Sequence, residues 1–256
     1  MKRRSFRAAR TSGPAEPLWI YGIHAVKAAL GNPRRASRRC VLTENAAANI
    51  GASLLKNVMA EITDPERISR LLPHGSVHQG AALACDPLPR LDLDDILSMP
   101  GRKIVLILDQ ISDPQNVGAI LRSAAAFDAA AVVVQDRHAP SESGTLAKAA
   151  SGALDLVPYV TVVNIARTLE QLGRAGFWRL ALGSDAGRPL GEAIPSGDVA
   201  LVLGSEGAGL RHLVRARCDG AASIPIGERM PSLNVSSAAA IALYECRRGP
   251  CIMRGP

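Results

Sequence analysis

Two polar side chains stand at the start of an alanine-rich helix near the C-terminal end of the chain. Ser232 and Asn234 lie in the stretch 231–237 (PSLNVSS), which is followed by the run 238–242 (AAAIA). The first turn of a helix presents unpaired N–H groups and a partial positive charge, so it can hold a polar ligand by its main chain. The two side chains could then be aimed at a reacting group. The alternative is that Ser232 or Asn234 is only the N-cap of this helix.

Two earlier segments, 104–127 and 199–218, have a similar order of parts. Each begins with an apolar run typical of a strand, continues with a polar loop that contains glycine, and ends in an amphipathic helix. In an open α/β sheet the loops at the carboxyl ends of parallel strands gather at one edge, so three such loops can form one pocket. The polar side chains that would meet there are Asn116, Arg122, Glu206, Ser232 and Asn234.

The three loops resemble, in order and in residue type, the signature motifs of the SpoU (TrmH-type) RNA 2′-O-ribose methyltransferases of the SPOUT superfamily. The matching segments are 113–122 (DPQNVGAILR), 203–210 (LGSEGAGL) and 224–236 (IPIGERMPSLNVS), and the resemblance covers residues 101–249. Three motifs in the family's order are far more specific than a single glycine pattern. Within the family, the chain resembles the bacterial 23S rRNA guanosine 2′-O-methyltransferases.

The resemblance implies a fold, a cofactor and a set of site residues. The implied fold is α/β, with a C-terminal trefoil-knotted SPOUT domain that has a mostly parallel sheet, preceded by a small α/β substrate-binding domain. The implied assembly is a homodimer, and the implied cofactor is S-adenosylmethionine, with no metal. The catalytic set would be Asn116, Arg122, Glu206, Ser232 and Asn234, and the cofactor-binding set Leu203, Gly204, Gly209, Ile224, Ile226, Ser232 and Leu233.

The implied reaction is one displacement, in which a ribose 2′-hydroxyl attacks the methyl carbon of a sulfonium. Alignment alone can supply on the order of 7–11 kcal/mol of the barrier reduction. The family's proposed proton acceptor corresponds to Arg122. A guanidinium is a poor acceptor, because it stays protonated up to a pH of about 12. Arg122 could instead grip the phosphate beside the target ribose and acidify the hydroxyl. A third interpretation is an ordinary ion pair with Asp113 or Asp128.

Asn116 and Glu206 also have simpler interpretations. Asn116 could cap the helix that follows it, a use that is compatible with a ligand contact. An unpaired Glu206 carboxylate near RNA would repel phosphate, so we expect it to pair with an arginine or with a helix start. Its role would then be to organise the site and not to exchange a proton.

Other classes of protein fit the motifs less well. The loop 204–209 lacks the glycine spacing of the dinucleotide fingerprint, which disfavours a nicotinamide-dependent oxidoreductase, and there is no Walker A sequence. The loop 183–187, after an apolar run at 178–182, is interpreted as an ordinary turn. A tRNA methyltransferase and a non-catalytic RNA-binding ribosome-assembly factor remain alternatives to an rRNA methyltransferase.

The positive charge of the chain is concentrated at its N-terminal end. The formal net charge is +7, and residues 1–39 contain ten Lys or Arg and one acid, Glu16. Such a bias predicts contact with nucleic acid, because neutralising phosphate supplies most sequence-independent affinity. A solvated basic tail without a partner, or an organelle transit segment, would have a similar composition.

The sequence divides into five parts. We expect a flexible basic extension at 1–16, an RNA substrate-binding domain at 17–86, a proline-rich acidic linker at 87–100, the SPOUT domain at 101–249 and a tail at 250–256. Within the second part, the pattern over 19–30 predicts a short entry followed by an amphipathic helix, and strands are expected at 39–42 and 79–85. The small domain resembles the one that rRNA-modifying members of the family carry.

The remaining composition bears on compartment and partners. The five cysteines have no zinc spacing, and their odd number favours reduced thiols in the cytoplasm. No apolar stretch approaches the roughly 20 residues that cross a membrane. Because aromatic residues make up 3% of the chain, recognition should depend on RNA shape and backbone contacts and not on base stacking. We expect the substrate to be a guanosine of 23S rRNA.

Overall fold

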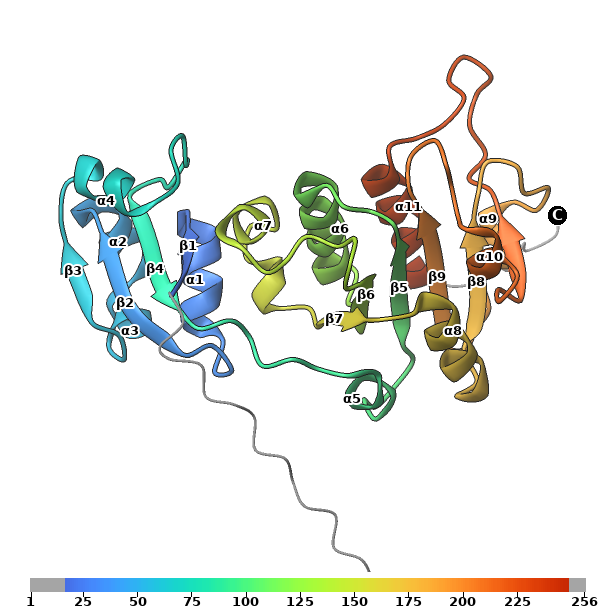
Figure 1. Ribbon diagram of the computed structural model, residues 1–256, viewed down its shortest axis with the longest axis horizontal. Coiled ribbons are helices and arrows are strands. Elements are labelled where there is room, and N and C mark those ends of the chain that lie inside the picture. Colours follow the sequence, from blue (N-terminus) through green and yellow to red (C-terminus); the bar gives the residue numbers. More distant parts are fainter. Residues whose placement is uncertain (1–16, 249–256) are drawn as a thin grey trace, which may run out of the picture.

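The computed structural model describes residues 17–248 and contains two sheets joined by a linker (Figure 1). The predicted basic extension at 1–16 and the predicted tail at 250–256 lie outside the described residues.

The N-terminal part is a small mixed sheet with helices on both faces. Its strand order is β1-β4-β2-β3, in which β1 and β2 are antiparallel to β4 and β3 is parallel to β2. The helix predicted within 19–30 and both predicted strands are present. The elements are β1 (Leu18–Tyr21), α1 (Ile23–Gly31), β2 (Ser37–Leu42), α2 (Glu44–Ile50), α3 (Ala52–Leu55), β3 (Ala60–Ile62), α4 (Pro65–Leu71) and β4 (Ala81–Cys85).

The C-terminal part contains a six-stranded sheet of order β10-β8-β9-β5-β6-β7, in which every pair is parallel. The mostly parallel sheet predicted from the sequence is therefore confirmed, whereas the trefoil knot stays a prediction. The elements are α5 (Leu93–Leu97), β5 (Ile104–Asp109), α6 (Pro114–Ala126), β6 (Ala131–Gln135), α7 (Gly144–Ala149), η1 (Ala153–Asp155), β7 (Tyr159–Val162), α8 (Ile165–Arg174), β8 (Trp178–Leu182), α9 (Leu190–Ala193), β9 (Val199–Gly204), α10 (His212–Arg215), β10 (Gly220–Ala222) and α11 (Val235–Arg248).

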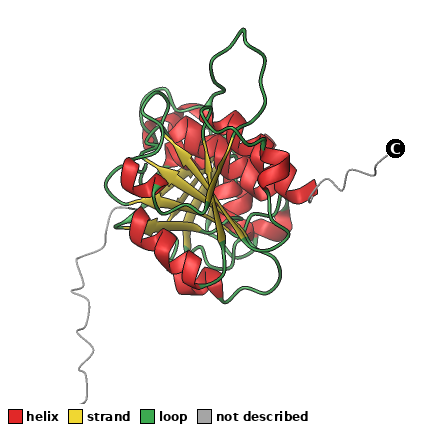
Figure 2. Cartoon of the chain, turned by 90° about the vertical axis from the view of Figure 1, so that its right-hand side faces the viewer, coloured by secondary structure: helices red, strands yellow, loops and turns green. Residues whose placement is uncertain are grey.

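The two apolar runs at 104–108 and 199–203 pair with each other in the middle of this sheet, from Ile104 opposite Val199 to Leu108 opposite Leu203. Both strands are buried on both faces, which explains why their sequences are continuously apolar. One face of β5 packs in the same core as residues of α6 and α11, and the other in the same core as residues of α8. Figure 2 shows the sheet with helices on both sides.

A close contact fixes α6 against α7. A Cβ added to Gly118 of α6 would lie 2.5 Å from the Cβ of Ala149, at the end of α7. Glycine therefore allows the two helix backbones to touch.

A buried ion cluster joins the small N-terminal domain to the C-terminal part. Arg35 Nε donates to Asp155 Oδ1 at 2.9 Å, and its Nη1 pairs with Glu142. Glu142 in turn accepts a hydrogen bond from the backbone N–H of Leu88, in the linker. The side chains of Arg35 and Asp155 are 0% and 1% exposed, so water screens their attraction little. Sequence reasoning missed this cluster.

The linker is less irregular than its proline-rich sequence suggests. Residues 93–97 form the short helix α5, which begins with a capping box between Asp92 and Asp95. The acidic residues of this segment therefore satisfy the backbone N–H groups of a helix start.

The four described cysteines are free thiols. Burial raises the pKa of Cys40, Cys85 and Cys246 to about 12, so these thiols stay protonated at neutral pH and react slowly.

Replacing Arg35 with methionine should lower the free energy of unfolding by about 3–5 kcal/mol, because Asp155 would remain buried without a cation. Urea unfolding followed by tryptophan fluorescence measures this loss. Arg34→Met is the matched control, since Arg34 is exposed and its side chain donates only to the carbonyl of Pro89. A similar loss in both variants would contradict a special role for the buried cluster.

Candidate active site

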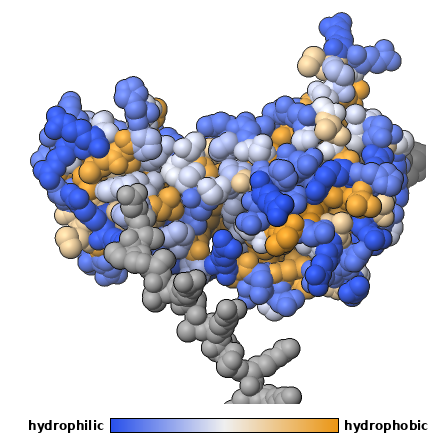
Figure 3. All heavy atoms as spheres, in the orientation of Figure 1, coloured by the Kyte–Doolittle hydropathy of each residue, from blue (hydrophilic) through white to orange (hydrophobic). Residues whose placement is uncertain are grey.

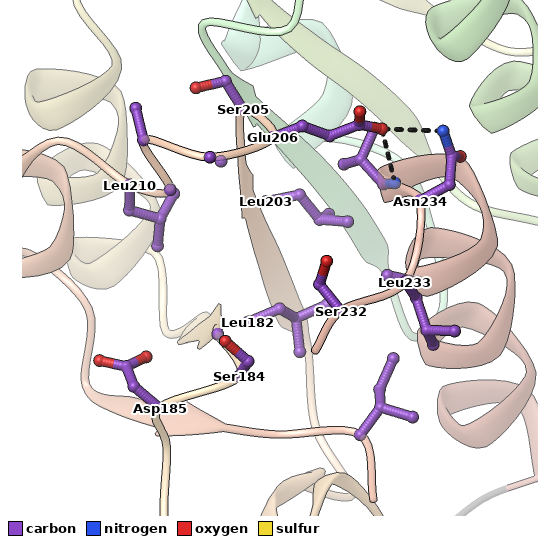
Figure 4. A pocket seen from close by; sticks show the side chains of 18 of the residues that line it. Leu182, Ser184, Asp185, Leu203, Ser205, Glu206, Leu210, Ser232, Leu233 and Asn234 are labelled. Carbon is purple, nitrogen blue, oxygen red and sulfur yellow. Dashed lines mark hydrogen bonds between the residues drawn. The ribbon is translucent and has the colours of Figure 1, made fainter. Parts of the chain in front are cut away.

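A cavity of about 850 Å³ opens at the carboxyl edge of the six-stranded sheet. The segments after β8, β9 and β10 form its walls, and the start of α11 closes one side (Figure 4). Two of the three predicted loops therefore meet here. The lining residues are Leu182, Gly183, Ser184, Asp185, Leu203, Gly204, Ser205, Glu206, Gly207, Ala208, Gly209, Leu210, Arg215, Ala222, Ile224, Ile226, Met230, Ser232, Leu233, Asn234, Val235 and Ala238.

The loop after β9 is tightly folded because Gly204 has no side chain. A Cβ at Gly204 would lie 2.2 Å from the backbone carbon of Gly209, a distance that real atoms do not reach. The loop closes with a 2.9 Å hydrogen bond from the N–H of Gly209 to the carbonyl of Ser205. Gly207 and Gly209 have φ values of 83° and 65°, which glycine adopts without strain.

The side chain of Asn234 connects the third predicted loop to this edge. Its Nδ2 donates to Glu206 Oε1 at 2.8 Å and to Asn116 Oδ1 at 3.0 Å (Figure 4 shows the bond to Glu206). Asn116 comes from α6, so residues of all three motifs are in direct contact. Asn116 itself does not line the cavity but reaches it through Asn234.

Asn234 is also the residue that caps α11. Its Oδ1 accepts from the N–H of Ser236 at 2.9 Å and from the hydroxyl of Ser236 at 2.6 Å. The capping and bridging uses of Asn234 are compatible because the oxygen does one and the nitrogen the other. Glu206 adds a longer contact of 3.4 Å to the N–H of Val235, so this carboxylate pairs with a helix start.

The helix α6 is capped by Asp113, whose carboxylate accepts from the N–H of Gln115 at 3.0 Å. Asn116 is therefore not the N-cap of α6. Arg122 is exposed on the same helix and does not line the cavity. Asp128, one of the partners considered for Arg122, pairs with Arg247 instead. Within residues 17–248 Arg122 forms no ion pair, so its guanidinium is available to an anion.

All seven residues of the predicted cofactor-binding set line the cavity. In Figure 4 the hydroxyl of Ser232 points towards Leu203, and Leu182 and Leu203 add apolar side chains to the lining.

The loop 183–187 is more than the ordinary turn that the sequence favoured. Gly183, Ser184 and Asp185 form one wall of the cavity, and Asp185 pairs with Arg215 of α10 at 3.1 Å. The hydrogen bond from Arg215 Nη1 holds the pKa of Asp185 below its usual range.

Sequence reasoning also missed a contact between Asp109 and Arg211, here called the clasp. Asp109, 0% exposed at the end of β5, accepts from the N–H of Arg211 at 3.0 Å and from its Nε at 2.9 Å. Arg211 also donates to Gln135 Oε1, at the end of β6. The clasp ties the loop after β9 to the ends of two neighbouring strands. An acidic residue directly after a buried apolar run was the available signal.

Within residues 17–248, no group of three or more His, Cys, Asp or Glu could hold a metal ion. None of the helices in that range is long and apolar enough to cross a membrane.

Comparison with known proteins identifies the family of this chain. Residues 103–244 match the model of the SpoU rRNA methylase family, and residues 19–91 match the RNA 2′-O ribose methyltransferase substrate-binding domain. The chain belongs to the SpoU rRNA methylase family. Both family models follow the chain in the order expected from the sequence.

Among curated SpoU relatives, the chain is 38% identical over 238 residues to the 23S rRNA (guanosine-2′-O-)-methyltransferase RlmB of Vibrio vulnificus, covering 90% of this chain and 96% of that protein. It is 36% identical to the RlmB protein of Coxiella burnetii, covering 90% and 94% of the two chains.

Solved SpoU structures share the fold. The methyltransferase AviRb from Streptomyces viridochromogenes in complex with the cofactor AdoMet has a TM-score of 0.77 at 22% identity, over 91% of this chain and 90% of its own. An AdoMet-bound rRNA methyltransferase from Sinorhizobium meliloti has a TM-score of 0.73 at 21% identity, over 91% and 87%.

Replacing Gly204 with alanine should lower the stability of the protein by about 1–3 kcal/mol, because the loop backbone at Gly209 must move. Gly187→Ala is the control, since Gly187 has no neighbouring atom within 4 Å of an added Cβ. Thermal unfolding by calorimetry measures both. An unchanged midpoint for Gly204→Ala would show that the loop is not held by this close contact.

Proposed function

We propose that this protein transfers a methyl group from S-adenosylmethionine to the ribose 2′-hydroxyl of a guanosine in 23S rRNA. The observation that supports this substrate is the similarity, over 90% of the chain, to relatives named for that reaction. The observation that supports the chemistry is the contact of Asn116, Glu206 and Asn234 beside a cavity.

The cavity suits a nucleoside-sized cofactor. Its volume lies within the range of about 300–1,000 Å³ that small-molecule sites occupy. Its walls combine apolar side chains with the backbone of the glycine loop 204–209, which can approach a ligand closely. The proposed contacts are the main chain and side chains of Leu203, Gly204, Gly209, Ile224, Ile226, Ser232 and Leu233. When bound there, the cofactor supplies a methyl group that is already activated by its sulfonium charge.

The protein's own contribution is mainly alignment. Glu206 accepts hydrogen bonds from Asn234 and from the start of α11, and so fixes the mouth of the cavity. Ser232 and Asn116 would present polar groups to the incoming ribose. A hydroxyl held in line with the methyl–sulfur bond needs little further help, because positioning can supply on the order of 7–11 kcal/mol.

Arg122 is proposed to bind a phosphate of the substrate next to the target ribose. Its exposed guanidinium on α6 has the planar donor geometry that suits a phosphate. Its positive charge would lower the pKa of the nearby 2′-hydroxyl and so assist loss of the proton to solvent.

The domain limits, assembly and compartment complete the proposal. Residues 17–86 would bind RNA, 87–100 would link the two domains, and 101–249 would carry the reaction.

A homodimer is proposed, with Ile241 and Tyr244 of α11 as exposed apolar candidates for the contact. Light scattering at working concentration should give twice the chain mass. The proposed compartment is the cytoplasm.

The deciding experiment is methyl transfer from radiolabelled S-adenosylmethionine to 23S rRNA, with tRNA as a second substrate. We expect label in 23S rRNA at a guanosine ribose and little in tRNA, and a large loss with Arg122→Ala. Label in tRNA alone would overturn the substrate. Absence of transfer to either RNA, with RNA binding retained, would identify an assembly factor instead.

Replacing Asn234 with serine separates catalysis from helix capping. Serine can still cap α11, so the stability should change by less than about 1 kcal/mol, whereas the donor to Glu206 and Asn116 is lost. We expect the methylation rate to fall at least about tenfold, corresponding to roughly 1.4 kcal/mol. Single-turnover kinetics and thermal unfolding are the two measurements. A full rate in this variant would return Asn234 to a capping role only.

A further inference from the structure

The seam between the small domain and α7 lies along the same edge of the molecule as the cavity. In Figure 1 the loop before β4, the start of α1, α7, the start of α6 and the cavity loops follow one another along the upper edge. Figure 3 shows that this edge is hollowed between two raised loops. An RNA strand entering the cavity from the small domain would therefore pass over the seam.

Lys148 of α7 is the cation at this seam. Its Nζ donates to Gln79 Oε1, across the seam, at 2.7 Å. Within residues 17–248 no acidic side chain forms an ion pair with it, and partial burial lowers its pKa. The pKa of His78 is also lowered, first by the burial of its ring and second by the charge of Lys148. The first turn of α1, which begins beside Lys148, contains no acidic residue.

The surrounding backbone leaves room for this ammonium. Gly22 has a φ of 94°, and a Cβ there would lie 2.6 Å from Lys148 Nζ. Gln79 and Gly80 both have positive φ values, 54° and 77°, which turn the loop toward α7. The ring of His78 holds that turn, because its Nδ1 accepts from the N–H of Gly80 at 3.0 Å.

The contact between Lys148 and Gln79 is not needed to dock the two domains. The buried cluster of Arg35, Glu142 and Asp155 already joins them. The start of α7 also touches β1 so closely that a Cβ at Gly144 would lie 2.3 Å from the carbonyl oxygen of Trp19. An exposed hydrogen bond between two long side chains adds little to such a junction.

We infer that Lys148 is a contact for a backbone phosphate of the substrate RNA, held in place by Gln79, between the small domain and the cavity. This inference rests on the proposed function, since it assumes that RNA is the substrate. The chemical group recognised is a phosphodiester, which Lys148 binds as a point charge without reading sequence.

Binding of a fluorescein-labelled RNA hairpin to the full-length protein, measured over a series of salt concentrations, tests the inference. With Lys148→Gln, the affinity should fall and the slope of log affinity against log salt should become less steep by about 0.7–0.9, the contribution of one phosphate. Lys148→Arg should keep the slope. Lys56→Gln, at an exposed position after α3 on the opposite edge of the small domain, is the matched control and should change neither quantity.

Gln79→Glu provides a second test with the opposite sign. The new carboxylate would pair with Lys148, so RNA affinity and the salt slope should fall while the thermal midpoint stays equal or rises. An unchanged slope in both Lys148→Gln and Gln79→Glu would overturn the inference, as would an equal change in Lys56→Gln. Methyl transfer is not part of this readout, so a protein that binds RNA through Lys148 without methylating it would refute the proposed function alone.

Discussion

The side-chain amide of Asn234 joins segments that are far apart in the chain. Its partner Asn116 lies 118 positions earlier and its partner Glu206 28 positions earlier. Each of these bonds requires that the loops after β5 and β9 and the start of α11 already stand at one edge of the sheet. The candidate site therefore exists only in the folded state, and its geometry depends on how accurately that edge is built.

The parallel pairing of β5 with β9 builds this edge. Six consecutive residue pairs, from Ile104 with Val199 to Asp109 with Gly204, set the two loops side by side. At the end of the ladder Asp109 is buried without solvent, and Arg211 compensates its charge while reaching Gln135. A buried carboxylate with a poor partner would be costly, so the clasp also restricts the positions that the glycine loop can take.

The sequence predicted the parts of the fold that depend on local pattern. The apolar runs, the helix after Gly22 and the polar loops were readable because periodicity and glycine placement report on a short stretch of chain. The family resemblance then named the cavity residues. The cluster around Arg35 could not be predicted, because nothing local distinguishes a buried arginine from the many exposed ones in a basic segment. Asp109 left a signal, an acidic residue at the end of a buried apolar run, but its partner Arg211 lies 102 positions later in the chain. The wall formed by Ser184 and Asp185 was missed for a similar reason, since a loop's own sequence does not show which ligand space it faces.

The buried cluster of Arg35, Glu142 and Asp155 has a consequence for the distance between the small domain and the candidate site. Because the two domains meet through paired charges and close backbone contacts, this packing sets that distance. The linker carries a short helix and one hydrogen bond to Glu142, so it tethers the domains and does not set that distance. A longer or shorter linker would therefore leave this distance unchanged, whereas a change in the packing between the domains would alter it.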